Sequence, residues 1–143
     1  SLEHQVDLLA LSEDPWWRLG SAADFLSGHD PGPMGDIDVL LSEADAQRLM
    51  SDQGLENLRD GGTPRYRSTI VLRPTLGEMP VELLAGYEVF QNDTWIAIWP
   101  TSRVSVTYPD REVFVPSVEE QISMLEMLGR AKDFDRIRAM QAR

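Results

Sequence analysis

The sequence contains no cysteine, which excludes disulfide bonds and thiolate metal sites. It also has no uninterrupted apolar run of about 18 residues, the length that a membrane-spanning helix needs. The amino-terminal residues lack the basic and then apolar pattern of a secretory signal. These absences predict a cytoplasmic protein that does not enter a membrane.

Basic residues are scarce, because 13 Lys and Arg stand against 24 Asp and Glu, a formal net charge of −11 at pH 7. Such a surface repels nucleic-acid backbones, so nonspecific binding to DNA or RNA is not expected. A small nucleotide that arrives with a divalent cation remains compatible with it. Five cations lie in the last 14 residues, where they either complement a helix dipole or face a phosphate: Arg130, Lys132, Arg136, Arg138 and Arg143.

A chain of 143 residues is long enough to bury a core and predicts one domain, residues 1–143. Helical segments come first, a run of strands follows, and helices end the chain, which is typical of an α+β protein. We expect a short mixed or antiparallel sheet flanked by helices, with a helical pair at the carboxyl terminus. The periodicity predicts helices at 2–12, 22–26, 42–53, 118–128 and 130–143, and strands at 16–19, 36–41, 65–74, 80–85, 87–91, 95–99, 104–108 and 112–116.

Two helix starts carry a serine followed three residues later by an acid. Ser42 with Asp45, and Ser117 with Glu120, predict capping boxes in which each side chain bonds the backbone N–H of the other residue. Gly129 is expected to divide the carboxyl-terminal helices into a pair.

Two aspartates lie in an otherwise apolar strand. Asp36 and Asp38 project from the same face, because side chains alternate along a strand, while Val39 and Leu41 point to the other face. Two bare carboxylates this close repel each other unless a cation lies between them. A divalent ion such as Mg²⁺ prefers oxygen ligands of this kind. The alternative is an exposed strand end with two solvated aspartates.

Two further features of the sequence are candidates for the same site. Gly20 and Ser21 stand at a strand-to-helix turn, where backbone N–H groups and the hydroxyl can hold a phosphate; plain helix capping is the alternative. Glu82 lies between two apolar residues of a predicted strand. It would add a third carboxylate to a two-metal site, unless it points outward.

Together, these elements resemble the nucleotidyltransferase superfamily typified by DNA polymerase β and kanamycin nucleotidyltransferase. The resemblance rests on Gly20-Ser21, on Asp36-Ile37-Asp38 and on Glu82. It extends to the tail, since "GRAKDFDRIRAM" (129–140) is similar to the Arg-x-Lys-Asp-x-x-Asp helix of small bacterial members. The preceding "VFVPSVEEQISMLEMLG" (113–129) is similar as well, so the resemblance covers most of the chain.

The resemblance implies an enzyme that uses Mg²⁺ or Mn²⁺ to move a nucleotidyl group from a nucleoside triphosphate such as ATP. The acceptor would be a hydroxyl of a small molecule or a protein. It implies that Asp36 and Asp38 ligate both metal ions, and that Glu82 ligates the catalytic ion and helps to deprotonate the acceptor. A non-catalytic nucleotide-binding or toxin–antitoxin-type partner module with the same fold is the second reading. An α+β interaction domain with surface acids is the third.

The same resemblance implies that Gly20 and Ser21 hold the β- and γ-phosphates and that Lys132 reaches the triphosphate. Apart from the resemblance, Arg65 and Arg67 share a predicted strand face. They either contact a nucleotide or acceptor phosphate or form a solvated face. The short chain and its tryptophans also make a homodimer an expectation.

The chain departs from the superfamily pattern at several points, and its loop from Ser21 to Asp36 is longer than is common. The loop before Asp36 reads Pro33-Met34-Gly35, without the Arg and the Thr or Ser that many small members carry there. Glu82 stands where Asp is more usual, and its longer arm is still expected to ligate a metal. These departures bear on turnover and acceptor choice more than on the fold.

Overall fold

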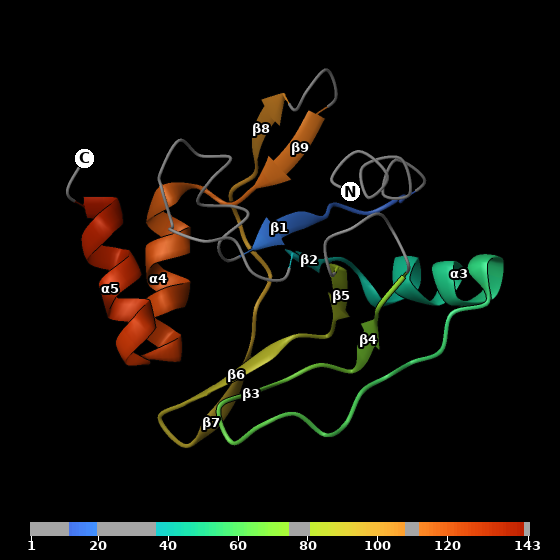
Figure 1. Ribbon diagram of the computed structural model, residues 1–143, viewed down its shortest axis with the longest axis horizontal. Helices are drawn as coiled ribbons and strands as arrows, with labels where there is room; N and C mark the ends of the chain where they lie inside the picture. The colour runs from blue at the N-terminus through green and yellow to red at the C-terminus, as the bar shows by residue number, and fades with distance from the viewer. Residues whose placement is uncertain (1–11, 20–36, 75–80, 108–111, 142–143) are drawn as a thin grey trace.

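The computed structural model describes residues 12–19, 37–74, 81–107 and 112–141 (Figure 1). Its centre is a four-stranded sheet in the order β1-β2-β5-β4, in which β2 and β5 run parallel and the other neighbours run antiparallel. The predicted mixed sheet is therefore confirmed. Its strands are β1 (Trp17–Leu19), β2 (Ile37–Leu40), β4 (Ile70–Leu72) and β5 (Val81–Ala85).

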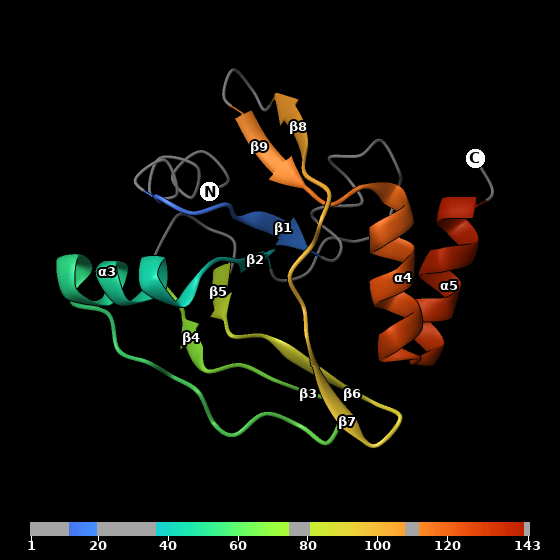
Figure 2. The same cartoon turned by 180° about the vertical axis from the view of Figure 1, so that it is seen from behind.

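The two faces of this sheet are covered by different helices (Figures 1 and 2). One face, which includes Val39 and Leu83, packs against Ala46 and Leu49 of α3 (Glu43–Gln53). The opposite face carries Trp17, Leu19 and Leu40 and packs toward α4 (Val118–Leu128). Because strand side chains alternate, a residue of β2 or β5 that is not on the α3 face points toward α4.

A second sheet of three antiparallel strands lies beside the first, in the order β3-β6-β7. Its strands are β3 (Tyr66–Arg67), β6 (Glu88–Gln91) and β7 (Thr94–Ala97). The prediction of one strand over 65–74 is wrong, because the chain bends at Ser68 and Thr69 and contributes β3 and β4 to different sheets.

The segment between β5 and β6, which lies opposite Ser68 and Thr69, is bent as well. Gly86, between β5 and β6, has φ 65°, and a Cβ there would lie 2.4 Å from the Oγ1 of Thr69, so only glycine fits. The amide of Thr69 still bonds the carbonyl of Ala85 at 2.9 Å across the bend. This double bend leaves Ser68 and Tyr87 at the junction of the two sheets, where both line a cleft.

The remaining elements are a hairpin and a helical pair. Strands β8 (Val104–Thr107) and β9 (Glu112–Val115) form the hairpin. Gly129, at φ 61°, ends α4 and separates it from α5 (Ala131–Gln141), which confirms the predicted pair. No helix in the described part of the chain is both long and apolar enough to span a membrane. The predicted helices at 2–12 and 22–26 lie outside the described residues.

Ser117 caps α4 as predicted, accepting from the amide of Glu120 at 3.2 Å, but the reciprocal half of this capping box is wrong. The Glu120 carboxylate accepts from the amides of Thr101 and Ser102, at 2.9 and 2.6 Å. The amide of Ser117 donates instead to the Ser102 hydroxyl, at 2.9 Å. Burial opposes ionisation of Glu120, yet the hydrogen bonds that it accepts from the Ser102 hydroxyl and from the two amides outweigh burial and lower its pKa. The acid thus ties α4 to the segment between β7 and β8.

The box at α3 is likewise half formed. Ser42 accepts from the amide of Asp45 at 3.0 Å, which confirms the cap. The buried Asp45 carboxylate accepts from the amides of Glu13 and Asp14, at 3.1 and 3.0 Å, and from Arg48. Through these hydrogen bonds, Asp45 links the segment before β1 to the start of α3.

Replacing Asp45 with Ala is expected to cost about 2–3 kcal/mol of unfolding free energy, because two backbone donors and a guanidinium lose their acceptor. Chemical denaturation measures the change. Asp52→Ala, at an exposed position of the same helix, is the matched control and should stay within about 0.5 kcal/mol of the native protein. Equal midpoints for the two variants would contradict this role of Asp45.

Candidate functional site

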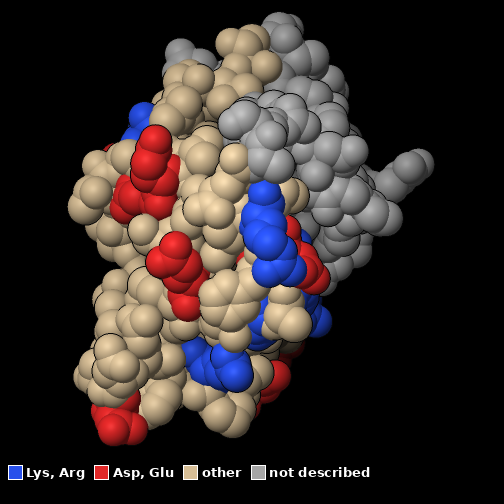
Figure 3. Space-filling model, turned by 90° about the vertical axis from the view of Figure 1, so that its left-hand side faces the viewer, with Lys and Arg blue, Asp and Glu red and all other residues tan. Residues whose placement is uncertain are grey.

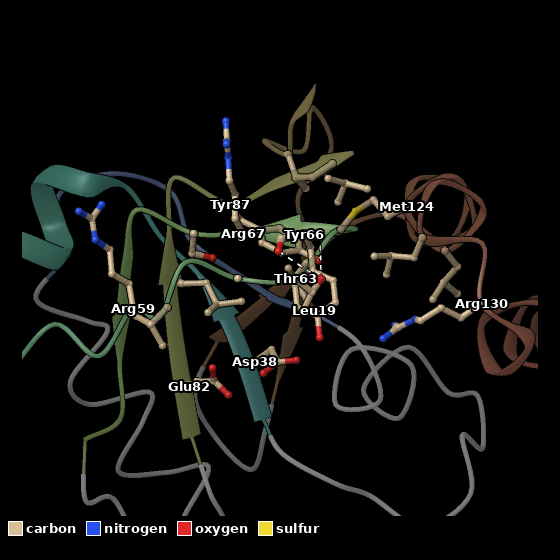
Figure 4. A pocket seen from close by; sticks show the side chains of 18 of the residues that line it. Leu19, Asp38, Arg59, Thr63, Tyr66, Arg67, Glu82, Tyr87, Met124 and Arg130 are labelled. Atoms are coloured by element: carbon tan, nitrogen blue, oxygen red, sulfur yellow. Dashed lines mark hydrogen bonds between the residues drawn. The ribbon is translucent and has the colours of Figure 1, made fainter. Parts of the chain in front are cut away.

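Two of the predicted carboxylates meet on the sheet. The parallel register pairs Asp38 of β2 with Glu82 of β5, so the two side chains leave the same face of strands about 4.8 Å apart. Figure 4 shows both carboxylates pointing in the same direction from their strands. Each is half-buried, and the Nη2 of Arg73 lies 3.7 Å from Glu82 Oε1. Two residues 44 positions apart thus form one acidic pair.

Three other predicted site residues, Gly20, Ser21 and Asp36, lie outside the described residues. Within residues 12–19, 37–74, 81–107 and 112–141, no group of three or more His, Cys, Asp or Glu could hold a metal ion. The pair of Asp38 and Glu82 is the part of the predicted ligand set that the structure shows. Paired carboxylate oxygens are the donors that Mg²⁺ takes from proteins.

The acidic pair lines a cleft of about 680 Å³. The cleft lies between the central sheet, the bend into the second sheet and the helices α4 and α5, and Leu19, Ile98 and Met124 form part of its apolar lining. Its volume is within the range of small-molecule sites, roughly 300–1,000 Å³.

The cleft gathers positive charge in a strongly acidic chain. Among the described residues, six cations line it, against three acids, Asp38, Asp60 and Glu82. Figure 3, which looks onto the side where α5 lies, shows Lys and Arg side chains gathered near the middle of that face. Such a lining favours an anionic ligand. The six cations are Arg59, Arg67, Arg73, Arg130, Lys132 and Arg136.

The structure separates Arg65 from Arg67. Arg67 lines the cleft, bonds Glu88 at 2.8 Å and places its guanidinium 4.1 Å from the centre of the Trp95 ring. Arg65 precedes the short strand β3, does not line the cleft, and donates to the carbonyl of Leu128 at 2.6 Å. Arg65 therefore completes the carboxyl end of α4.

Lys132 lies in the first turn of α5 and lines the cleft. Its side chain is exposed and has no ion-pair partner within the described ranges. Its side chain is therefore accessible for the predicted contact with a phosphate.

The start of α5 is held by a buried ion pair. Arg130 donates to Asp133 through Nε at 2.6 Å, through Nη2 at 2.9 Å and through its backbone amide at 3.0 Å. Asp133 is fully buried; burial would raise its pKa, but the bonds from Arg130 outweigh that effect and lower it. The hydrogen-bonded partner of Asp133 is Arg130, and the charge of Arg136 also lowers its pKa. The pair orients Arg130 toward the cleft.

Tyr87 interacts electrostatically both with Asp38 of the acidic pair and with Arg130. Burial first, and then the charge of Asp38, raise the pKa of its hydroxyl well above the ordinary value, while the charge of Arg130 acts in the opposite direction. Tyr87 therefore stays protonated and neutral at physiological pH, beside the floor of the cleft.

Sequence reasoning missed Arg59, Arg73 and Tyr87 as cleft residues. Arg73 follows directly after β4, and Arg59 precedes the Asp-Gly-Gly turn, so each stands at the end of a recognisable element. Tyr87 lies at the bend after Gly86, where a strand-to-strand glycine was the available signal.

No protein-family model and no curated protein sequence matches this chain. Solved structures do. TM1012 of Thermotoga maritima, named as a nucleotidyltransferase, superposes with a TM-score of 0.74 at 20% identity, over 96% of this chain and 88% of that one. The chain has the nucleotidyltransferase fold.

Two further solved structures share this nucleotidyltransferase fold. The lincosamide antibiotic adenylyltransferase LnuA, solved with lincomycin, gives a TM-score of 0.59 at 17% identity, over 98% of this chain and 94% of that one. ANT(2'')-Ia, solved with adenylyl-2''-tobramycin, gives 0.59 at 11% identity, over 99% and 86%. At these identities the similarity shows the fold alone.

Proposed function

We propose that this chain transfers a nucleotidyl group from a nucleoside triphosphate to a hydroxyl group of an acceptor. The observation that carries the proposal is the register of Asp38 with Glu82 on the wall of a cationic cleft, in a chain with the nucleotidyltransferase fold. An acidic pair suits a divalent metal ion, and the surrounding cations suit the triphosphate that accompanies it.

In this proposal Asp38 and Glu82, with Asp36 as predicted from the sequence, hold Mg²⁺. The ion, when bound, neutralises phosphate charge during the displacement. The acceptor oxygen forms a bond to the α-phosphorus, the bond between that phosphorus and the α,β-bridging oxygen breaks, and pyrophosphate leaves. Glu82 takes the hydroxyl proton, the role that the resemblance implies for it. Lys132 and Arg130 bind phosphate oxygens.

ATP is the first nucleotide to test. Two proteins of the same fold, LnuA and ANT(2'')-Ia, are an adenylyltransferase and a protein solved with an adenylylated product. The cleft also places Tyr66 beside its cations, with the Arg130 guanidinium 6.0 Å from the ring centre, which offers an aromatic surface for a base.

The test is thermal melting with each nucleoside triphosphate, in the presence and absence of Mg²⁺ or Mn²⁺. A ligand at ten times its Kd should stabilise the protein by about 1.4 kcal/mol, which is roughly a 4 °C rise for a domain of this size. We expect the rise to require both metal and nucleotide, because each brings charge that the other balances.

The rise should disappear in Asp38→Asn and persist in Asp93→Asn, a turn position whose φ of 61° asparagine tolerates and which does not line the cleft. If no nucleotide, at concentrations up to millimolar, raises the melting temperature, the proposed enzymatic function is excluded. The non-catalytic partner module with the same fold then becomes the better account.

A further inference from the structure

We propose that the acceptor is a small hydroxylated molecule that also carries an anionic group, a carboxylate or a phosphate. The inference rests on the proposed function and names the substrate class of the same cleft. It follows from how the cations are distributed around the acidic pair.

The six cations of the cleft form two groups. The helical group comprises Arg130, Lys132 and Arg136, at the start and first turns of α5. The strand group comprises Arg59, Arg67 and Arg73, from the segment after α3, from β3 and from the residue after β4. Figure 4 shows Arg59 and Arg130 on opposite sides of Asp38 and Glu82.

In the proposed displacement, the acceptor and the leaving pyrophosphate lie on opposite sides of the acidic pair. In an in-line transfer the attacking oxygen and the leaving pyrophosphate lie on opposite sides of the phosphorus, which must itself lie at the acidic pair. Because each side of the pair carries a cationic group, the acceptor faces positive charge whichever group binds the triphosphate. A cationic acceptor would be repelled from either side.

The properties of Lys132 favour the helical group as the binding site of the triphosphate. It is exposed, lines the cleft and has no ion-pair partner within the described ranges, so it can meet a phosphate as a point charge. Arg130 beside it is held in place by Asp133. The strand group is then left for the acceptor.

The strand group has the chemistry to bind a planar or tetrahedral anion. Arg59 is exposed and has no side-chain partner in the described part of the chain, and Arg73 makes one long contact, 3.7 Å, to Glu82. When Glu82 holds a metal ion, Arg73 loses that contact and its guanidinium is available. Arginine forks match carboxylate and phosphate oxygens with two hydrogen bonds.

Arg67 contributes less, because Glu88 bonds it at 2.8 Å and Trp95 covers its guanidinium. Asp60 is the one acid lining the strand side apart from Glu82 among the described residues, and its Oδ1 accepts from the amide of Gly62 at 2.9 Å. Among the described residues, the positive charge that Arg59 and Arg73 bring to this side exceeds the negative charge of Asp60 once Glu82 holds a metal ion.

The experiment is calorimetric titration of protein saturated with Mg²⁺ and α,β-methylene-ATP, whose α,β bridge cannot be cleaved by transfer. Glycerol 3-phosphate, glycerate, glycerol and choline are the probes. They share a hydroxyl and differ in carrying a phosphate, a carboxylate, no charge or a positive charge. We expect at least one anion to bind about tenfold or more tightly than glycerol, and choline not to bind. The stronger of the two anions identifies the group.

Arg59→Gln and Arg73→Gln should each weaken anion binding about tenfold. Arg59→Gln should leave the affinity for Mg²⁺–α,β-methylene-ATP unchanged, whereas Arg73→Gln, which frees Glu82, should not weaken it. Lys132→Gln should instead weaken the affinity for the nucleotide and leave anion binding unchanged. Arg138→Gln, an exposed cation that pairs with Asp135 and does not line the cleft, is the control for loss of one positive charge. It should change neither affinity.

The two proposals fail in different ways. If α,β-methylene-ATP does not bind with metal, the proposed function is wrong. If it binds but neither anion binds more tightly than glycerol, or if both arginine variants bind the anions like the native protein, the anionic acceptor is wrong while the nucleotidyltransferase remains. Preferential binding of choline would also overturn the inference.

Discussion

Asp38→Asn is expected to reduce nucleotidyl transfer about a hundredfold or more while the protein still folds. The substitution keeps the shape of the side chain but removes half of the negative charge of the acidic pair, which holds the metal against the triphosphate. Metal stabilisation of the transferring phosphoryl group is worth several kcal/mol, and about 2.7 kcal/mol corresponds to a hundredfold. The loss should appear both in kcat and in the affinity for Mg²⁺–ATP, since the metal ion that Asp38 holds both binds the triphosphate and promotes transfer.

Pyrophosphate release from Mg²⁺–ATP in the presence of an acceptor measures this effect, and Glu82→Gln should show a loss of similar size. Asp60→Asn tests whether an acid elsewhere on the lining of the cleft has the same effect; it should retain activity within a few fold, because its carboxylate bonds the amide of Gly62. Near-native kcat in both Asp38→Asn and Glu82→Gln would refute the two-carboxylate site.

Asp133→Asn is expected to lower the unfolding free energy by about 2–3 kcal/mol, roughly 6–10 °C in melting temperature. The fully buried carboxylate accepts three bonds from Arg130, and the amide that replaces it leaves the guanidinium without its counter-charge. Asp135→Asn is the control, because its pair with Arg138 is exposed at both ends and such pairs contribute about 0–1 kcal/mol.

The same residue gives a pH signature. The pKa of Asp133 is lowered in the folded protein, so below the ordinary Asp pKa of about 3.9 the unfolded chain binds the proton first. The contribution of Asp133 is fully present above that pH and is lost as the pH falls toward the lowered value. The stability difference between the native protein and Asp133→Asn should shrink below about pH 4 in chemical denaturation. A constant difference between pH 7 and pH 3 would contradict this assignment.

Local signals were enough for much of the fold. Serine caps at Ser42 and Ser117 and the glycine at Gly129 mark real helix boundaries, because capping depends on bonds within one helical turn. The apolar alternation around Asp38 and Glu82 identified both strands, since burial of one sheet face imposes a period of two. The predicted strand over 65–74 failed at the bend, where periodicity continues but the chain changes sheets.

Nonlocal bonds were not predictable in this way. Asp45 and Glu120 have the spacing of capping-box acids, but each accepts from amides of a segment far along the chain. A buried carboxylate takes whatever donors the tertiary structure brings to it, and sequence spacing carries no information about them. For the same reason, Arg65 was grouped with Arg67 although it bonds the end of α4.

By itself, the sequence determined which residue types are available: an acid on each of two apolar strands, cations concentrated near the carboxyl terminus, and the order of helices and strands. These follow from burial and capping, which act over a few residues. The tertiary structure decided that β2 and β5 lie side by side in parallel register, which sets Asp38 against Glu82. It also decided that Arg59 and Arg130 lie on opposite sides of that pair and that Arg73 lines the same cleft. Strand order and register depend on the packing of both sheet faces at once, and no local pattern contains that information.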